Sequence, residues 1–133
     1  MNINQGEIRR FHDSSGQLFV LDGPDLPFKV SRIYFISNVA GQFSRGRHAH
    51  KSLQQVMWSI GGDITVCLDD GFEQKSFRLC DSSNYIHIPA GLWREISNFD
   101  SNATLMVAAN QNYDETDYIR DYDEFLTWKR EIG

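Results

Sequence analysis

Turn-forming residues divide most of this chain into short runs whose side chains alternate in character. In the run 28–37, for example, Arg32 and Tyr34 would lie on one face of a strand and Phe35 on the other. Aspartate and glycine, as at Asp70-Gly71, supply turn signals between such runs. The expected strands are residues 7–11, 17–21, 28–37, 43–50, 54–60, 64–68, 72–79, 85–88, 93–98 and 103–109. Roughly ten short strands at this spacing predict an all-β sandwich or barrel.

The C-terminal part of the chain has a different periodicity. From Thr116 onward, apolar side chains recur at helical spacing, namely Ile119, Tyr122, Phe125, Leu126 and Ile132. Asp114 or Thr116 could cap such a helix, because a short polar side chain there can accept a hydrogen bond from a free backbone N–H. We therefore expect a short C-terminal helix that begins near Thr116 and packs over an opening or an edge of the barrel.

Composition narrows the class of protein further. The net charge of −5 gives no general attraction to nucleic acid or anionic lipid. No apolar run approaches the roughly 18 residues of a membrane-spanning helix, and the N-terminal sequence MNINQGEIRRF lacks the apolar core of a signal peptide. With no linker or internal repeat, the sequence predicts a single domain over residues 1–133, located in the cytoplasm, without nucleic-acid or membrane partners.

Two histidines are the most informative polar residues. His48 and His50 are two apart on an expected strand, so their side chains project from the same face. This spacing resembles the first motif of the cupin superfamily, with Gln54 where the motif has a glutamate. The second cupin motif, Pro-x-Gly-x-x-His-x-x-x-Asn, matches residues 89–98 except that Arg94 replaces the histidine. The resemblance implies a cupin-type jelly roll, a double-stranded β-helix barrel, with both histidines in its cavity.

The two replacements bear on metal binding. Neutral Gln54 is a weaker ligand than a carboxylate, and the Arg94 guanidinium has no lone pair to donate. Two histidines alone rarely hold a catalytic metal, which usually has at least three protein ligands. An imidazole titrates near neutral pH and can serve as a general base. The sequence therefore predicts proton transfer next to a carbonyl, as in tautomerisation or epimerisation, without a metal.

A longer pattern extends over nearly the whole chain. It consists of Arg45-Gly46-x-His48-Ala49-His50-Lys51 with Gln54, Leu68-Asp69-Asp70-Gly71, Pro89 with Trp93 and Glu95, and the tail from Tyr113 to Phe125. This pattern resembles the sugar-nucleotide 3,4-ketoisomerases. The resemblance implies an isomerase that moves the carbonyl of dTDP-4-keto-6-deoxy-D-glucose from C4 to C3 in deoxyamino-sugar biosynthesis. It also implies a homodimer with exchanged strands and no cofactor.

The same resemblance suggests roles for individual residues. His50 would remove the C3 proton of the sugar, and His48 would hold charge or relay a proton. Tyr34 and Arg32 could meet the sugar oxygens and stabilise an enediolate by hydrogen bonds. The other expected substrate-binding residues are Arg45 and Lys51 for the diphosphate, Trp93 for stacking on thymine, Gln54 and Glu95.

Several alternatives stay open from the sequence alone. Many relatives have a second tyrosine where this chain has Phe35. If the catalytic tyrosine of the family belongs to position 35, this chain lacks its hydroxyl. Arg94 could contact substrate or point to solvent, and Trp93 could be a core residue. A dTDP-sugar 3,5-epimerase, a metal-dependent cupin oxygenase and a non-enzymatic sugar-nucleotide-binding cupin are the competing functions. The configuration of the product at C4, galacto or gluco, is undetermined.

Overall fold

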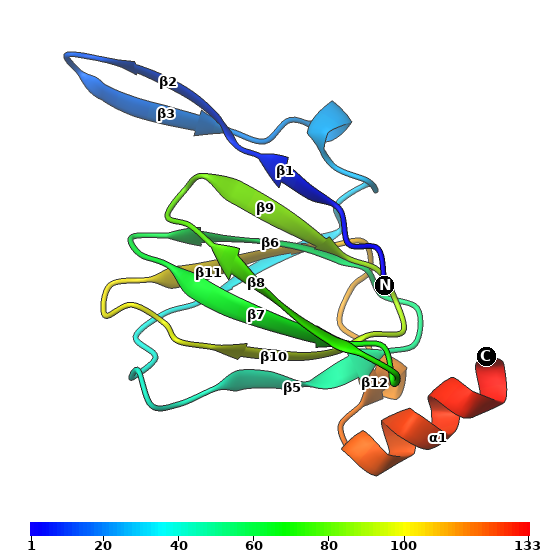
Figure 1. The fold of residues 1–133 in the computed structure, drawn as a ribbon. Coiled ribbons are helices and arrows are strands. Elements are labelled where there is room, and N and C mark those ends of the chain that lie inside the picture. The colour runs from blue at the N-terminus through cyan, green and yellow to red at the C-terminus, as the bar shows by residue number, and fades with distance from the viewer.

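The computed structural model describes residues 1–133 and consists mainly of β-strands with one C-terminal helix (Figure 1). The strands are β1 (Gln5–Glu7), β2 (Arg9–Asp13), β3 (Gly16–Val20), β4 (Arg32–Ile36), β5 (Arg45–His50), β6 (Gln55–Ile60), β7 (Ile64–Asp69), β8 (Gln74–Leu79), β9 (Asn84–Ile88), β10 (Trp93–Ser97), β11 (Thr104–Ala109) and β12 (Tyr118–Ile119). The helices are the 3₁₀ turns η1 (Gly23–Asp25) and η2 (Glu115–Asp117), and the α-helix α1 (Tyr122–Ile132).

The strands form two facing five-stranded sheets and a separate hairpin. One sheet has the order β1-β9-β6-β11-β4, the other β12-β5-β10-β7-β8, and β2 pairs only with β3. All pairings are antiparallel. This arrangement confirms the predicted all-β cupin-type jelly roll. The expected strand 7–11 is in fact two strands, because Ile8 is buried between them and the chain leaves the sheet there to form the hairpin β2–β3.

The hydrophobic core lies between the two sheets, where the alternating pattern places every second side chain. Ile64, Val66 and Leu68 of β7 are fully buried, and they pack in one cluster with Ile86 of β9 and Leu105 of β11. Burying one such side chain stabilises the fold by roughly 1.5–3 kcal/mol relative to leaving it exposed. Part of the barrel interior is occupied by polar side chains, described below.

The C-terminal helix begins later than the sequence pattern predicts. α1 starts at Tyr122, and its N-cap is Asp121, whose carboxylate accepts the Glu124 N–H at 3.0 Å. The prediction of a start near Thr116 is wrong because the chain first forms η2, which Asp114 caps. It then pairs as β12 with the end of β5, so Ile119 is buried as a strand residue opposite Ala49. α1 is anchored by Phe125, which is fully buried beside Trp93.

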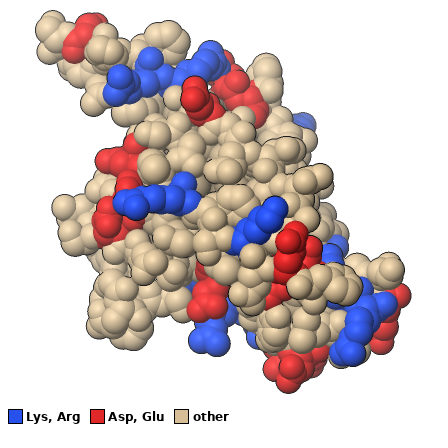
Figure 2. Space-filling view, in the orientation of Figure 1, with Lys and Arg blue, Asp and Glu red and all other residues tan.

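The surface carries both charge signs without segregation on the face seen in Figure 2. Lysine and arginine side chains there lie beside aspartate and glutamate. Ion pairs of the chain include Arg78–Asp63 and Arg9–Asp22. No single basic patch stands out on this face. Among the helices, none is both long and apolar enough to cross a membrane.

Candidate active site

His48 and His50 point into the barrel from β5, as their spacing predicts. Their Nε2 atoms are 3.1 Å apart, and the ring planes are nearly perpendicular at 88°. His50 is fully buried and His48 is half-buried. A β-bulge precedes them: Gly46 and Arg47 both have positive φ, and the register with β10 shifts there. The bulge places the Gly46 carbonyl 3.0 Å from Nδ1 of His48.

The buried carboxylate of Asp117 contacts the ring nitrogen of His50 that faces away from His48. Oδ2 of Asp117 lies 3.1 Å from Nδ1 of His50. The same carboxylate accepts three further hydrogen bonds, from the Ser52 N–H, the Ser52 hydroxyl and the Leu53 N–H, at 2.8, 2.7 and 3.1 Å. Asp117 reaches this position because β12, directly after it, pairs with β5 so that Tyr118 lies opposite His50.

A second chain of polar groups links Tyr34 and Gln55 of the opposite sheet to Arg94, which lies on β10 beside β5. The Tyr34 hydroxyl accepts a hydrogen bond from Nε2 of Gln55 at 3.0 Å, and Oε1 of Gln55 accepts one from Arg94 at 2.5 Å. The second Arg94 nitrogen donates to the Leu92 carbonyl at 3.0 Å. Arg94 is fully buried, so the interpretation that it points to solvent is wrong. Phe35 is 65% exposed on the outer face, so Tyr34 is the residue whose hydroxyl faces the barrel interior.

Cationic and aromatic side chains gather where this polar half of the barrel meets solvent. The Arg32 guanidinium lies 4.6 Å from the ring centroid of Tyr34 and 5.4 Å from that of Tyr113. Arg120 covers Tyr118 at 4.1 Å, and Tyr118 in turn contacts both imidazole rings. One nitrogen of Arg32 and the Nε of Arg94 are buried without a hydrogen-bond partner. Such unpaired donors are costly unless something else binds them.

Burial controls the charge of this cluster. Removal from water lowers the pKa of His48 to about 4 and that of His50 to about 3, and the nearby positive charge of Arg94 adds to both effects. Burial also raises the pKa of the Tyr34 hydroxyl. At neutral pH the cluster therefore contains two uncharged imidazoles, a protonated phenol and the Arg94 cation, whose hydrogen-bond partners are neutral.

We expect an NMR titration to find both histidines neutral well below the usual value near 6.5. Because their pKa values are lowered, protonation should begin only as pH falls toward about 4. Substituting Arg94→Met removes a positive charge and should move both midpoints upward. Imidazole carbon-bound proton shifts recorded against pH would measure this, and wild-type midpoints near 6.5 would contradict it.

Several predicted site residues lie outside the histidine cluster. Oε1 of Gln54 lies 2.8 Å from Nε2 of His87 on the outer side of the barrel. The glutamine that points into the barrel is the next residue, Gln55, which binds Arg94. Trp93 packs under α1 against Tyr122 and Phe125. Glu95 lies near Trp93 on the outer face, where the two help to line a hollow of about 270 Å³.

The two cations predicted for the diphosphate are placed differently. Lys51 is exposed and directly follows His50 in the chain. Arg45 is exposed at the other end of β5, roughly 16 Å of extended strand from His50. The structure therefore brings together His48, His50, Tyr34 and Arg32 but not Arg45, Gln54, Trp93 or Glu95.

Sequence reasoning missed two members of the cluster. Asp117 is 67 residues from His50, and no spacing rule links the two positions. The one signal for Gln55 is alternation, which puts it on the same face of the strand as Met57 and Ser59; that this face lines the interior is seen only in the structure. No group of three or more histidine, cysteine, aspartate or glutamate side chains is placed to hold a metal ion.

Comparison with known proteins agrees with this arrangement. The family model described as FdtA: WxcM-like, C-terminal matches residues 1–130. The chain belongs to this family. A relative from Aneurinibacillus thermoaerophilus, TDP-4-oxo-6-deoxy-alpha-D-glucose-3,4-oxoisomerase, is 37% identical over 127 residues, which are 95% of this chain and 91% of the relative. The resemblance predicted from the histidine motif and the tail is thereby confirmed.

Solved structures of family members superpose closely. The 3,4-ketoisomerase from Helicobacter canadensis has a TM-score of 0.93 at 37% identity, with 98% of each chain covered. A histidine-to-asparagine mutant of the 3,4-ketoisomerase QdtA from Thermoanaerobacterium thermosaccharolyticum, in complex with TDP-4-keto-6-deoxyglucose, has a TM-score of 0.92 at 34% identity. That match covers 98% of this chain and 95% of the other.

Proposed function

We propose that this protein is an isomerase that converts dTDP-4-keto-6-deoxy-D-glucose into the corresponding 3-keto sugar. The observation that carries the proposal is the pair of imidazoles, with their Nε2 atoms 3.1 Å apart, inside the barrel of a member of this family. Proton transfer next to a carbonyl needs a base that is unprotonated at neutral pH, and the lowered histidine pKa values supply one.

The proposed reaction balances with protons alone. His50 takes the proton from C3, the C3–H electrons form a C3–C4 double bond, and O4 gains the negative charge of an enediolate. A proton is then delivered to C4 while the O3 proton moves to O4, which leaves the carbonyl at C3. Nothing is oxidised or reduced overall, so the proposal includes no metal and no redox cofactor.

The remaining cluster residues suit the enediolate. The Tyr34 hydroxyl accepts a hydrogen bond from Gln55, which leaves its own proton free to be donated to a sugar oxygen. The unpartnered nitrogen of Arg32 is a second donor beside it. In a site removed from water, such donors stabilise developing negative charge strongly. Lys51, the residue after His50, is the candidate for the diphosphate, whereas Arg45 lies at the far end of β5.

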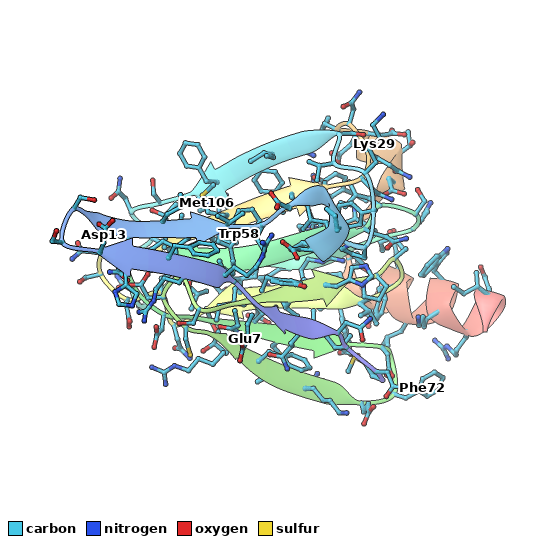
Figure 3. The ribbon with its side chains drawn as sticks, turned by 90° about the horizontal axis from the view of Figure 1, so that it is seen from above. Glu7, Asp13, Lys29, Trp58, Phe72 and Met106 are labelled. Carbon is cyan, nitrogen blue, oxygen red and sulfur yellow. The ribbon has the colours of Figure 1, made fainter.

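We also propose that the protein is a homodimer with exchanged hairpins. The outer face of the sheet β1-β9-β6-β11-β4 exposes apolar side chains, with Ile33 61% and Phe35 65% exposed. Figure 3 looks down on this face, with β2–β3 crossing above the sheet near Trp58. The hairpin pairs with no other strand, and Phe11 and Leu18 are exposed on it. An isolated hairpin is marginally stable, and a partner would cover both surfaces.

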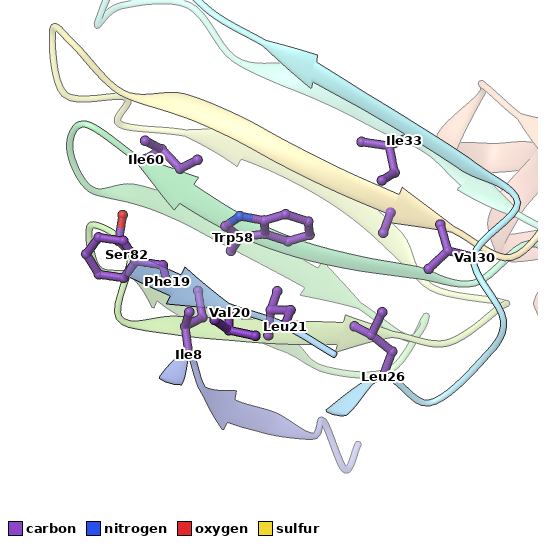
Figure 4. A pocket seen from close by; sticks show the side chains of 11 residues that line it. Ile8, Phe19, Val20, Leu21, Leu26, Val30, Ile33, Trp58, Ile60 and Ser82 are labelled. Atoms are coloured by element: carbon purple, nitrogen blue, oxygen red, sulfur yellow. The ribbon is translucent and has the colours of Figure 1, made fainter. Parts of the chain in front are cut away.

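An apolar hollow supports the same interface. It has a volume of about 490 Å³ and lies between the hairpin and the outer face of the sheet, not at the histidines (Figure 4). Its lining consists almost entirely of apolar residues, namely Ile8, Phe19, Val20, Leu21, Leu26, Val30, Ile33, Trp58, Ile60, Ala108 and the polar Ser82. A second copy that places the same surface here would form an isologous, two-fold contact.

Carbonyl migration is the direct test of the activity. The purified protein is incubated with dTDP-4-keto-6-deoxy-D-glucose labelled with ¹³C at C4, and we expect the labelled carbon to change from a carbonyl or its hydrate to a hydroxyl-bearing carbon. Inversion at C5 with the carbonyl retained at C4 would instead indicate a 3,5-epimerase. Saturable binding of dTDP without any turnover would indicate a sugar-nucleotide-binding protein.

A further inference from the structure

The two histidines lie in the middle of a chain of four polar groups. In order, the groups are the Asp117 carboxylate, His50, His48 and the Gly46 carbonyl, with contacts of 3.1, 3.1 and 3.0 Å. Both ends of this chain are acceptors. Three hydrogen bonds would need three protons on the four ring nitrogens, whereas two neutral imidazoles carry only two.

The position of those two protons follows from the two ends. The Gly46 carbonyl can only accept, so it favours a proton on Nδ1 of His48. Asp117 is held as an acceptor by the Ser52 and Leu53 groups, and acceptance of these hydrogen bonds lowers the pKa of its carboxyl. It therefore favours a proton on Nδ1 of His50. Both Nε2 atoms are then unprotonated and face each other at 3.1 Å.

We propose that Asp117 and the Gly46 carbonyl are positioning groups that make the gap between the two Nε2 atoms a site for one proton. The inference rests on the proposed isomerase function and specifies where the C3 proton goes. A proton taken up by Nε2 of His50 forms a hydrogen bond to Nε2 of His48, in place of two opposed lone pairs. The histidine pair binds the first proton together and holds it until it is returned to C4.

The charged groups around the gap limit its capacity to one proton. The fully buried Arg94 cation lies on β10, which pairs with β5 in the same sheet, and Arg120 lies beyond Tyr118 at the solvent side. Glu115 pairs with Arg120, and Asp117 is the carboxylate bonded to the histidines. A second proton would place two imidazolium rings 4.8 Å apart beside Arg94, which like-charge repulsion opposes.

Asp117→Asn tests the role of the carboxylate. An amide cannot accept all four hydrogen bonds, and when its NH₂ faces His50 the ring must place its proton on Nε2. The gap between the two Nε2 atoms then already contains a proton. We expect kcat to fall by roughly 10²- to 10⁴-fold with the affinity for dTDP unchanged within about threefold. ¹⁵N NMR should show Nδ1–H tautomers for both histidines in the wild type and an Nε2–H tautomer for His50 in the variant.

Asp114→Asn is the matched control. It removes a carboxylate from the same segment, where Asp114 caps η2 through Thr116, without contacting the histidines. We expect its kcat to stay within about threefold of the wild type. A wild-type Nε2–H tautomer at His50, or full kcat in Asp117→Asn, would overturn the inference; the first readout needs no variant. If the wild type lacks turnover but shows both Nδ1–H tautomers, the proposed function fails and the proton site stands.

Discussion

Replacing His50 with asparagine is expected to lower kcat by roughly 10²- to 10⁴-fold. Asparagine is of similar size and its NH₂ group can still donate a hydrogen bond to Asp117, but its amide takes up no proton near neutral pH. The interior of the barrel should therefore keep its shape while the base is lost. Rates of carbonyl migration at saturating dTDP-4-keto-6-deoxy-D-glucose would measure the effect.

Two further measurements make the His50→Asn result specific. Binding of dTDP should change by no more than about threefold, because His50 is fully buried and the nucleotide must bind nearer to solvent. His87→Asn is the control, since His87 lies on the outside of the barrel against Gln54, and we expect it to keep wild-type kcat. An unchanged kcat in His50→Asn would remove this histidine from the mechanism.

Charges introduced on the outer face of the sheet are expected to separate the dimer. The double variant Ile33→Glu/Phe35→Glu places carboxylates at two positions that the proposed partner would cover. In the single chain the Ile33 and Phe35 side chains are 61% and 65% exposed. Burial of unpaired charge costs several kcal/mol, so about 4 kcal/mol would raise the dimer Kd by roughly 10³-fold. Sedimentation should give twice the 15.3 kDa chain mass for the wild type and the single mass for the variant.

A control at another exposed aromatic residue separates loss of the interface from general effects of added charge. Phe72 is 85% exposed in the turn between β7 and β8, away from the proposed interface. Phe72→Glu should remain dimeric. Circular dichroism must show that the double variant keeps its β-structure. A monomeric wild type at micromolar concentration would contradict the dimer, and a dimeric double variant would contradict this interface.

Local patterns predicted the strands well and the C-terminal segment poorly, for a physical reason. Alternation separates the two faces of a strand, and it correctly placed Tyr34 and Phe35 on opposite faces; the structure shows that the face of Tyr34 is the inner one. Helical spacing of apolar residues cannot tell a helix from a turn, a short strand and a helix in succession. Ile119 fits the helical stripe, yet it is buried through pairing of β12 with β5. That pairing is a long-range contact, which no local window contains.

The candidate site likewise combines residues that a local pattern predicts with residues that only long-range contacts bring together. His48 and His50 share a strand, so their proximity follows from a spacing of two residues. Asp117 and Gln55 complete the cluster through tertiary contacts. Trp93 and Glu95 precede and follow Arg94 on β10, so alternation points them outward if Arg94 points inward. The direction of Arg94 is seen in the structure, where its side chain is fully buried.

Isomerisation in deuterated water tests the central claim most directly. The purified protein is mixed with dTDP-4-keto-6-deoxy-D-glucose in D₂O, and the sugar is followed by NMR. The proton-transfer mechanism predicts a 3-keto product that retains its C5 hydrogen. C4 carries deuterium in every product molecule formed after the histidine pair has exchanged its proton with solvent. Deuterium at C5 with the carbonyl still at C4 would contradict it, and so would an unchanged sugar.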